Sequence, residues 1–248
     1  MILCGNKEAK DVFLPYAQWA ILRLEDMIVA VKGGNNHEPH NHNDIGSYMF
    51  VKGNDIIADE LGSAKYTKTY FDKEVRYTFL NAGSQGHSLP IVNGCRQQGG
   101  IGYEADTFEK TDDGIRISFA DAYDKKSGLK TLIRDLTLDE NGVLIKDYFK
   151  FLSTTNSVTE RIITKLDATV QDKNKVLILK KGKAVAMIEF SLGGKINISY
   201  DSYFMPNSSG RSDEYSSEDA KQSVTIIEYE CFTDSDNTEI SYMIKGGQ

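Results

Sequence analysis

The sequence has little cysteine, little proline and no long apolar run, and each shortage excludes a class of protein. Three cysteines among 248 residues cannot build a dense disulfide framework, and no Cys-x-x-Cys pair is present to form a zinc ribbon. The four prolines fall between candidate strands and interrupt none of them. No apolar run reaches the roughly 18 residues of a membrane-spanning helix, so we expect no membrane span.

The charge balance is acidic, with 29 Lys and Arg residues against 36 Asp and Glu residues and a formal net charge of −7. Nucleic-acid-binding domains are usually basic, so no nucleic-acid partner is expected. An acidic polysaccharide remains a possible ligand, because a local basic groove can lie on an acidic protein. The contents of 40% hydrophobic and 26% charged residues are typical of a globular protein and exclude a disordered chain.

Period-two alternation of apolar and polar residues recurs along the chain, whereas helical periodicity is nearly absent. Turn residues at 53–54, 139–142 and 180–183 separate pairs of alternating runs, which is typical of β-hairpins. We therefore predict an all-β fold, a large antiparallel β-sandwich of a dozen or more strands, over residues 1–248 as a single domain. A split near residue 155 is the alternative. Residues 62–85 are expected to form a long loop with a helical turn, and residues 207–219 a surface loop.

Chemistry is expected where the histidines gather. The chain has four histidines, three of them within six residues (His37, His40 and His42), with His87 further along. Imidazole suits both proton transfer near neutral pH and metal binding. If residues 40–48 are extended, His40 and His42 face the same side with Cα atoms about 6–7 Å apart. Both could then bind one metal ion, or one could bind the metal while the other acts on a substrate. His37 has no assigned role and is expected to be exposed.

Asp59 is the next carboxylate of interest, at the end of a candidate strand. A tight turn at residues 53–54 would pair Lys52 with Asp55, and hence Tyr48 with Asp59. Asp59 would then face the same side as His42, but about 20 Å away along an extended chain. The chain must bend, or the turn must be longer, for the two side chains to share an ion.

Four ordered segments between residues 19 and 100 together resemble the heparinase II/III-like polysaccharide lyases. They are His-Asn-His-Asn-Asp-Ile-Gly-Ser-Tyr at 40–48, Ala-Asp-Glu-Leu-Gly at 58–62, Arg-Tyr at 76–77, and Gly-His-Ser-Leu-Pro with Val-Asn-Gly at 86–94. The ordered set is specific, although each piece alone is weak. The resemblance implies that this chain is similar to the C-terminal β-sandwich of such lyases, which packs against an N-terminal α/α toroid with sugar bound between the two.

The resemblance also implies roles for particular residues. One divalent metal ion, usually zinc in the family, would be held by His42, Asp59 and His87. The cleft-facing catalytic histidine of the family matches His40. Tyr77 resembles a further catalytic, substrate-contacting residue, and the predicted substrate-binding residues beside these are Arg76 and Asn41.

The chain departs from the family in having no helical half. The family's main tyrosine acid or base, and the Asn or His that binds the uronate carboxylate, lie in the toroid. We therefore expect an isolated sandwich that is incomplete as a catalyst without a helical domain or chain. The resemblance implies a periplasmic or extracellular location, although the first residues show no signal peptide.

Three functions remain open from the sequence. The first is β-elimination on an acidic, uronate-containing polysaccharide such as heparin, heparan or alginate. The second is a non-catalytic module that binds carbohydrate or another protein around a structural metal. The third, indicated by His-x-His with an aspartate and a distant histidine, is a metal-dependent hydrolase or a cupin-like dioxygenase.

Overall fold

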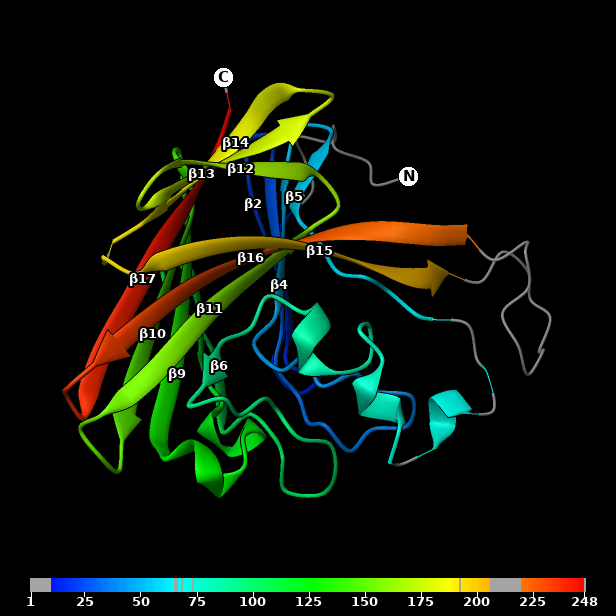
Figure 1. Ribbon diagram of the computed structural model, residues 1–248, viewed down its shortest axis with the longest axis vertical. Coiled ribbons are helices and arrows are strands. Elements are labelled where there is room, and N and C mark those ends of the chain that lie inside the picture. Colours follow the sequence, from blue (N-terminus) through cyan, green and yellow to red (C-terminus); the bar gives the residue numbers. More distant parts are fainter. Residues whose placement is uncertain are drawn as a thin grey trace.

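The computed structural model describes residues 10–64, 67, 69–72, 74–191, 193–205 and 220–247, and these form an all-β fold (Figure 1). Within these residues seventeen strands make three antiparallel sheets of five, eight and four strands. The predicted fold class is therefore confirmed. The surface loop expected at 207–219 lies outside the described residues. No helix in the described part of the chain is long and apolar enough to cross a bilayer.

The five-stranded sheet follows chain order, because each strand is joined to the next by a short connection or, between the third and fourth strands, by the loop of residues 33–47. Its strands are β1 (Val12–Leu14), β2 (Trp19–Leu24), β3 (Met27–Lys32), β4 (Tyr48–Lys52) and β5 (Asp55–Ala58). Alternation in β3 buries Met27, Val29 and Val31 and leaves the intervening residues half-buried. One face of this sheet therefore packs on the core and the other remains partly open.

The eight-stranded sheet has the order β12-β13-β14-β17-β10-β9-β8-β7. Its members are β7 (Thr107–Lys110), β8 (Gly114–Ser118), β9 (Leu129–Asp139), β10 (Gly142–Phe151), β12 (Asp167–Asp172), β13 (Lys175–Lys180), β14 (Lys183–Phe190) and β17 (Asn237–Gly246). The three predicted hairpins, β4–β5, β9–β10 and β13–β14, are all confirmed.

The four-stranded sheet has the order β15-β16-β11-β6, formed by β6 (Ile91–Val92), β11 (Asn156–Thr164), β15 (Lys195–Met205) and β16 (Ala220–Thr233). Strand β11 is buried at nearly every position because both of its faces are covered. Val158 and Ile162 face the main core. Ile163 packs on the other side, against Tyr203 from β15 and against Leu61 from the loop that follows β5. This second cluster packs that loop against the four-stranded sheet.

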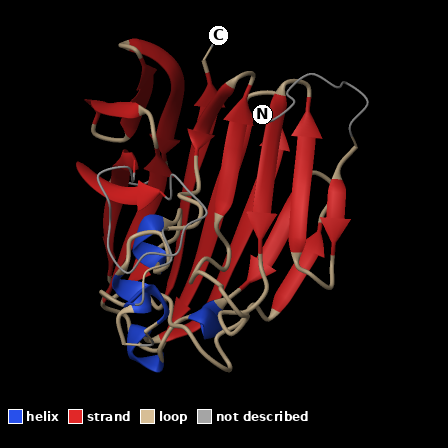
Figure 2. Cartoon of the chain, turned by 90° about the vertical axis from the view of Figure 1, so that its right-hand side faces the viewer, coloured by secondary structure: helices blue, strands red, loops and turns tan. Residues whose placement is uncertain are grey.

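The main cluster of buried apolar side chains draws on all three sheets. The assignment of residues 1–248 to one domain stays a prediction. Short 3-10 helices gather at one end of the strands (Figure 2). Three of them, η1 (Thr69–Phe71), η2 (Arg76–Thr78) and η3 (Ser84–Gly86), lie in the segment expected to be a loop with a helical turn. The other two are η4 (Ala120–Ala122) and η5 (Lys125–Ser127).

Candidate functional site

The candidate site is built from two loops, residues 33–47 between β3 and β4, and residues 59–90 between β5 and β6. Figure 1 shows them together beside β11, in blue and in cyan to green. The two loops are joined directly, because the backbone N–H of Asn43 donates a hydrogen bond to the Ala82 carbonyl at 2.9 Å. Residues 40–47 form no strand, so the extended geometry that would put His40 and His42 on one side is not present. His40 has a φ of +63°, so the same-face relation of His40 and His42 does not follow from strand geometry.

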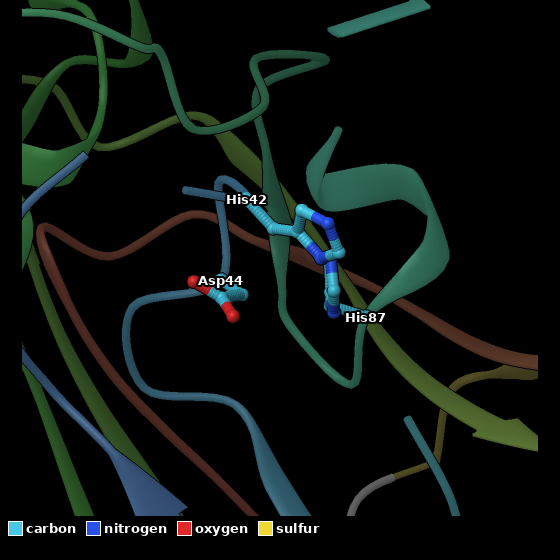
Figure 3. A group of neighbouring side chains, drawn as sticks. All are labelled: His42, Asp44 and His87. Atoms are coloured by element: carbon cyan, nitrogen blue, oxygen red, sulfur yellow. The ribbon is translucent and has the colours of Figure 1, made fainter. Parts of the chain in front are cut away.

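Two histidines and one aspartate converge within these loops. One ligand atom each of His42, Asp44 and His87 lies within 4.8 Å of the other two (Figure 3). The imidazole centroids of His42 and His87 are 5.5 Å apart. His87 is fully buried, whereas His42 and Asp44 are half-buried. The predicted meeting of His42 and His87 is thus found, although they are separated by 45 residues of chain.

The surroundings of His87 fit a metal ligand. Its Nδ1 contacts Oε2 of Glu60, and because a carboxylate accepts hydrogen bonds, Nδ1 is the protonated nitrogen. Its Nε2 is buried without a hydrogen-bond partner among the described residues. In metal-binding histidines one ring N–H commonly donates a hydrogen bond to a carboxylate, while the other ring nitrogen binds the ion. Burial alone would lower the pKa of His87, but the charge and hydrogen bond of Glu60 raise it.

His42 is suited to remain neutral. Burial and the neighbouring His87 lower the pKa of His42 to about 4. A neutral imidazole is the form that binds metal ions. Its Nε2 lies 3.3 Å from the hydroxyl of Tyr70, which fixes the ring orientation. Around a tetrahedral zinc ion, ligand atoms lie about 3.4 Å apart, so binding an ion would draw the three side chains together.

A cavity of about 190 Å³ lies beside this cluster. Its wall includes His42, Asp44, Glu60, Lys32 and the half-exposed Trp19. Lys32 forms an ion pair with Asp44. The cavity therefore brings a lysine–aspartate ion pair, a second carboxylate and an imidazole together beside an apolar ring.

Asp59, the predicted third ligand, is not one of the three residues whose ligand atoms meet. Its carboxylate pairs with Lys165 at 2.9 Å, and its amide donates to the Ile163 carbonyl at 2.9 Å. The cause is a β-bulge in β5, where the pairing shifts so that Phe50 lies opposite Ala58. The predicted Lys52–Asp55 pair is confirmed, but the expected Tyr48–Asp59 register is wrong.

A shift of one residue turns successive side chains to the opposite face. Asp59 therefore points to β11, and the next residue, Glu60, reaches His87. The role of Asp59 as a metal ligand stays a prediction, whereas the structure brings Asp44 to the histidines. Sequence reasoning gave no role to Asp44 or Glu60. The spacing of Asp44, two residues after His42, was the available signal for the first.

The predicted catalytic and substrate-binding residues form a second group beside the cluster. His40 is exposed, and its ring meets Phe71 edge-on at 5.2 Å. The hydroxyl of Tyr77 donates to Oδ1 of Asn41 at 3.0 Å. Gly99 leaves room for the Tyr77 ring, since a Cβ there would lie 2.3 Å from it. The structure thus brings His40, Asn41 and Tyr77 to one end of the fold.

Arg76, the predicted substrate-binding arginine, lies inside the loop, and its contact with a sugar stays a prediction. It is only 7% exposed, and its guanidinium donates to the carbonyls of Asn41 at 2.7 Å and Tyr70 at 3.2 Å. The rings of Tyr70, Phe71 and Tyr77 lie 4.6–5.8 Å from its Cζ atom. Such cation–π contacts stabilise a buried guanidinium. Arg76 therefore holds the loop that carries Asn41. As predicted, His37 is exposed.

Comparisons with solved structures found several proteins of similar fold. A heparan sulfate lyase from Pedobacter heparinus is similar over 97% of this chain, with a TM-score of 0.68 and 14% identity. A heparinase III structure is similar over 96% of the chain, with a TM-score of 0.67 and 13% identity. This chain spans 37% of the length of each.

A 4-alpha-glucanotransferase from Thermococcus litoralis is also similar, with a TM-score of 0.53 and 9% identity over 92% of this chain and 37% of that one. No protein-family model matches the chain, and no curated protein matches it significantly. At these identities the likeness shows the fold. The fold is therefore that of a heparinase III-type β-sandwich, and the transferase shows that this fold alone does not define one reaction.

Proposed function

We propose that this chain is the β-sandwich part of a polysaccharide lyase that cleaves an acidic, uronate-containing polysaccharide by β-elimination. One observation carries the proposal: a heparinase III-like fold presents His40, Asn41 and Tyr77 beside the cluster of His42, Asp44 and His87. Heparin, heparan and alginate-like chains are the candidate substrates. By analogy with the lyases, the protein would work in the periplasm or outside the cell.

In this proposal His40 takes the C5 proton of the uronate, or helps to neutralise its carboxylate. The proton at C5 becomes acidic only when the adjacent carboxylate is neutralised, so donors must face that group. Tyr77 would give a proton to the departing O4 as the C4–O4 bond breaks, and its hydroxyl, which donates to Oδ1 of Asn41 in the free chain, would turn to the substrate. Arg76 contributes by holding the Asn41 carbonyl.

One divalent ion, with zinc as the first candidate, would be held by His42 and His87 together with a carboxylate. Asp44 is the carboxylate that the geometry favours, and Asp59 is the one that the family resemblance favours. The unpartnered Nε2 of His87 and the neutral imidazole of His42 support this assignment. The ion would stabilise the contact between the two loops.

Groups on both sides of a bound sugar must act together in an elimination, and this chain supplies one side. The partner proposed for the other side is an α/α toroid, as a domain or a separate chain. The test measures the ultraviolet absorbance of the unsaturated product from heparan sulfate and alginate, with this chain alone and with an α/α toroid supplied as a separate protein. We expect turnover only with the toroid, and a large loss in His40→Ala and Tyr77→Phe.

The second candidate is a non-catalytic carbohydrate-binding module. This candidate is supported by the similarity of the fold to both a lyase and a glucanotransferase, because a fold shared by different reactions does not define one of them. Polysaccharide binding that survives His40→Ala, with no product under any pairing, would establish this candidate and reject the lyase.

A further inference from the structure

The two site loops meet at a buried arginine that no sequence motif indicated. Arg134 lies on β9, on the core side of the eight-stranded sheet, and its side chain is fully buried. Together with Asp147 of β10 and Glu160 of β11 it forms a buried ionic group, here called the Arg134 cluster. All three side chains are 0% exposed, so their interactions are shielded from solvent and salt.

Every N–H of the guanidinium has an acceptor. Nε and Nη2 donate to the two oxygens of Asp147 at 2.8 and 2.5 Å, and Nη2 also donates to Oε2 of Glu160 at 3.3 Å. The two protons of Nη1 go to main-chain carbonyls, Gly46 at 2.9 Å and Ser88 at 2.8 Å. A guanidinium carries five N–H groups in a fixed planar arrangement, and here all five are used.

The two carbonyls belong to the two site loops. Gly46 lies two residues after Asp44, and Ser88 directly follows His87. One nitrogen atom of Arg134 therefore joins the loop that carries His42 and Asp44 to the loop that carries His87. Ser88 is held a second time, because its hydroxyl accepts from the Ile163 amide at 3.1 Å.

Stability alone does not account for a buried ionic group of this kind. Apolar residues of similar volume are often at least as stabilising as a buried ion pair. An apolar side chain, however, would leave the Gly46 and Ser88 carbonyls without these donors in the protein interior. The rings of Tyr48 and Phe119, 5.7 and 5.8 Å from Cζ of Arg134, close the space around it.

We propose that Arg134 is the positioning residue of the site, which holds the His42–Asp44 loop and the His87 loop at their mutual distance through the Gly46 and Ser88 carbonyls. Asp147 fixes the plane of the guanidinium, and Glu160 ties it to the four-stranded sheet. Only the catalytic or metal-binding role of the two loops rests on the proposed function. The contact itself needs neither metal nor polysaccharide.

The test compares Arg134→Met and Arg134→Lys with Ile178→Ala. Ile178 is fully buried on β13, in a part of the eight-stranded sheet remote from β9, so its truncation lowers global stability without touching the loops. Lysine keeps the charge but has three donors, too few for five acceptors. If Arg134→Met does not fold, Arg134→Lys carries the comparison.

Hydrogen exchange of the metal-free proteins is followed in peptides covering residues 40–47, residues 84–89 and strand β17. We expect exchange in both loops to rise about tenfold or more in the Arg134 variants, relative to β17, and to keep its wild-type ratio in Ile178→Ala. Loop exchange that rises only in step with β17 would overturn the proposal. Zinc affinity is measured in parallel and should fall about tenfold in the Arg134 variants but not in Ile178→Ala. If the wild-type protein binds no zinc, the proposed metal fails, while the exchange data still decide the role of Arg134.

Discussion

The strand framework and the two site loops are stabilised in different ways. In the sheets, neighbouring strands satisfy the backbone and apolar side chains fill the core. In the loops, the backbone lacks ladder partners, and most of the buried polar side chains of the described chain lie between residues 36 and 97. The comparison teaches that the position of the histidines depends on individual side-chain hydrogen bonds more than on apolar burial.

Gln97 illustrates how a side chain replaces a strand. Its Oε1 accepts from the Ile45 amide at 3.1 Å, and its Nε2 donates to the Ile45 carbonyl at 2.6 Å. Its own carbonyl accepts from the Asn43 side chain at 3.3 Å. Ile45 is thus paired as a residue in a ladder would be, but by an amide side chain whose loss leaves buried groups unsatisfied.

The largest expected effect on stability comes from truncating two phenylalanines, one in the strand framework and one beneath a site loop. Phe190 stacks on Tyr229 at 4.1 Å within the core, whereas Phe119 lies under Gly46. Truncation of either to alanine should lower the free energy of unfolding by about 3–5 kcal/mol, measured with urea. Only Phe119→Ala should also speed hydrogen exchange in residues 40–47 beyond the global change. Equal effects of both variants on that loop would remove the distinction between the two regions.

Two glycines with the same backbone conformation sharpen the comparison further. Gly46 and Gly34 both have a φ of +84°, but a Cβ at Gly46 would lie 2.9 Å from the Phe119 ring, while nothing lies within 4 Å at Gly34. Gly34→Ala should cost about 1 kcal/mol from backbone strain alone. Gly46→Ala should cost about 2–4 kcal/mol, because the clash adds to the strain. Thermal unfolding of both variants measures the difference, and similar losses would show that Phe119 moves aside freely.

A smaller, pH-dependent effect is expected at the Arg134 cluster. Burial and the adjacent Asp147 carboxylate raise the pKa of Glu160 well above its ordinary value. Folded Glu160 therefore keeps its proton where the unfolded chain has lost it, and stability falls as the pH rises above the ordinary glutamate pKa. Glu160→Gln removes this titration. Between about pH 5 and about pH 8, the thermal unfolding midpoint of the variant should therefore fall less than that of the wild type. Parallel melting curves of the two proteins over this range would contradict the assignment.

Alternation predicted the sheets well because most strands have one buried and one open face. Strand β11 shows no such alternation, since Glu160 and Arg161 interrupt its apolar pattern and both are buried by partners distant in sequence. In the loops the sequence indicated the histidines but not the carboxylate of Asp44 that lies beside them. The bulge near Ala58 changes which carboxylate faces His87, and no local motif marks it. The burial of Arg76 depends on three rings near it in sequence and on a hydrogen bond to the carbonyl of Asn41, 35 residues away, and no local pattern indicates that contact.

The most direct test is the metal content and zinc affinity of protein purified without a histidine tag, as the wild type and as His42→Ala, His87→Ala, Asp44→Asn and Asp59→Asn. The structure predicts one ion per chain, lost in both histidine variants, weakened in Asp44→Asn and retained in Asp59→Asn, because Asp44 and not Asp59 lies with the two histidines. Loss of the ion in Asp59→Asn with retention in Asp44→Asn would contradict the ligand set that the structure favours, and a wild-type chain that binds no ion would contradict the site itself.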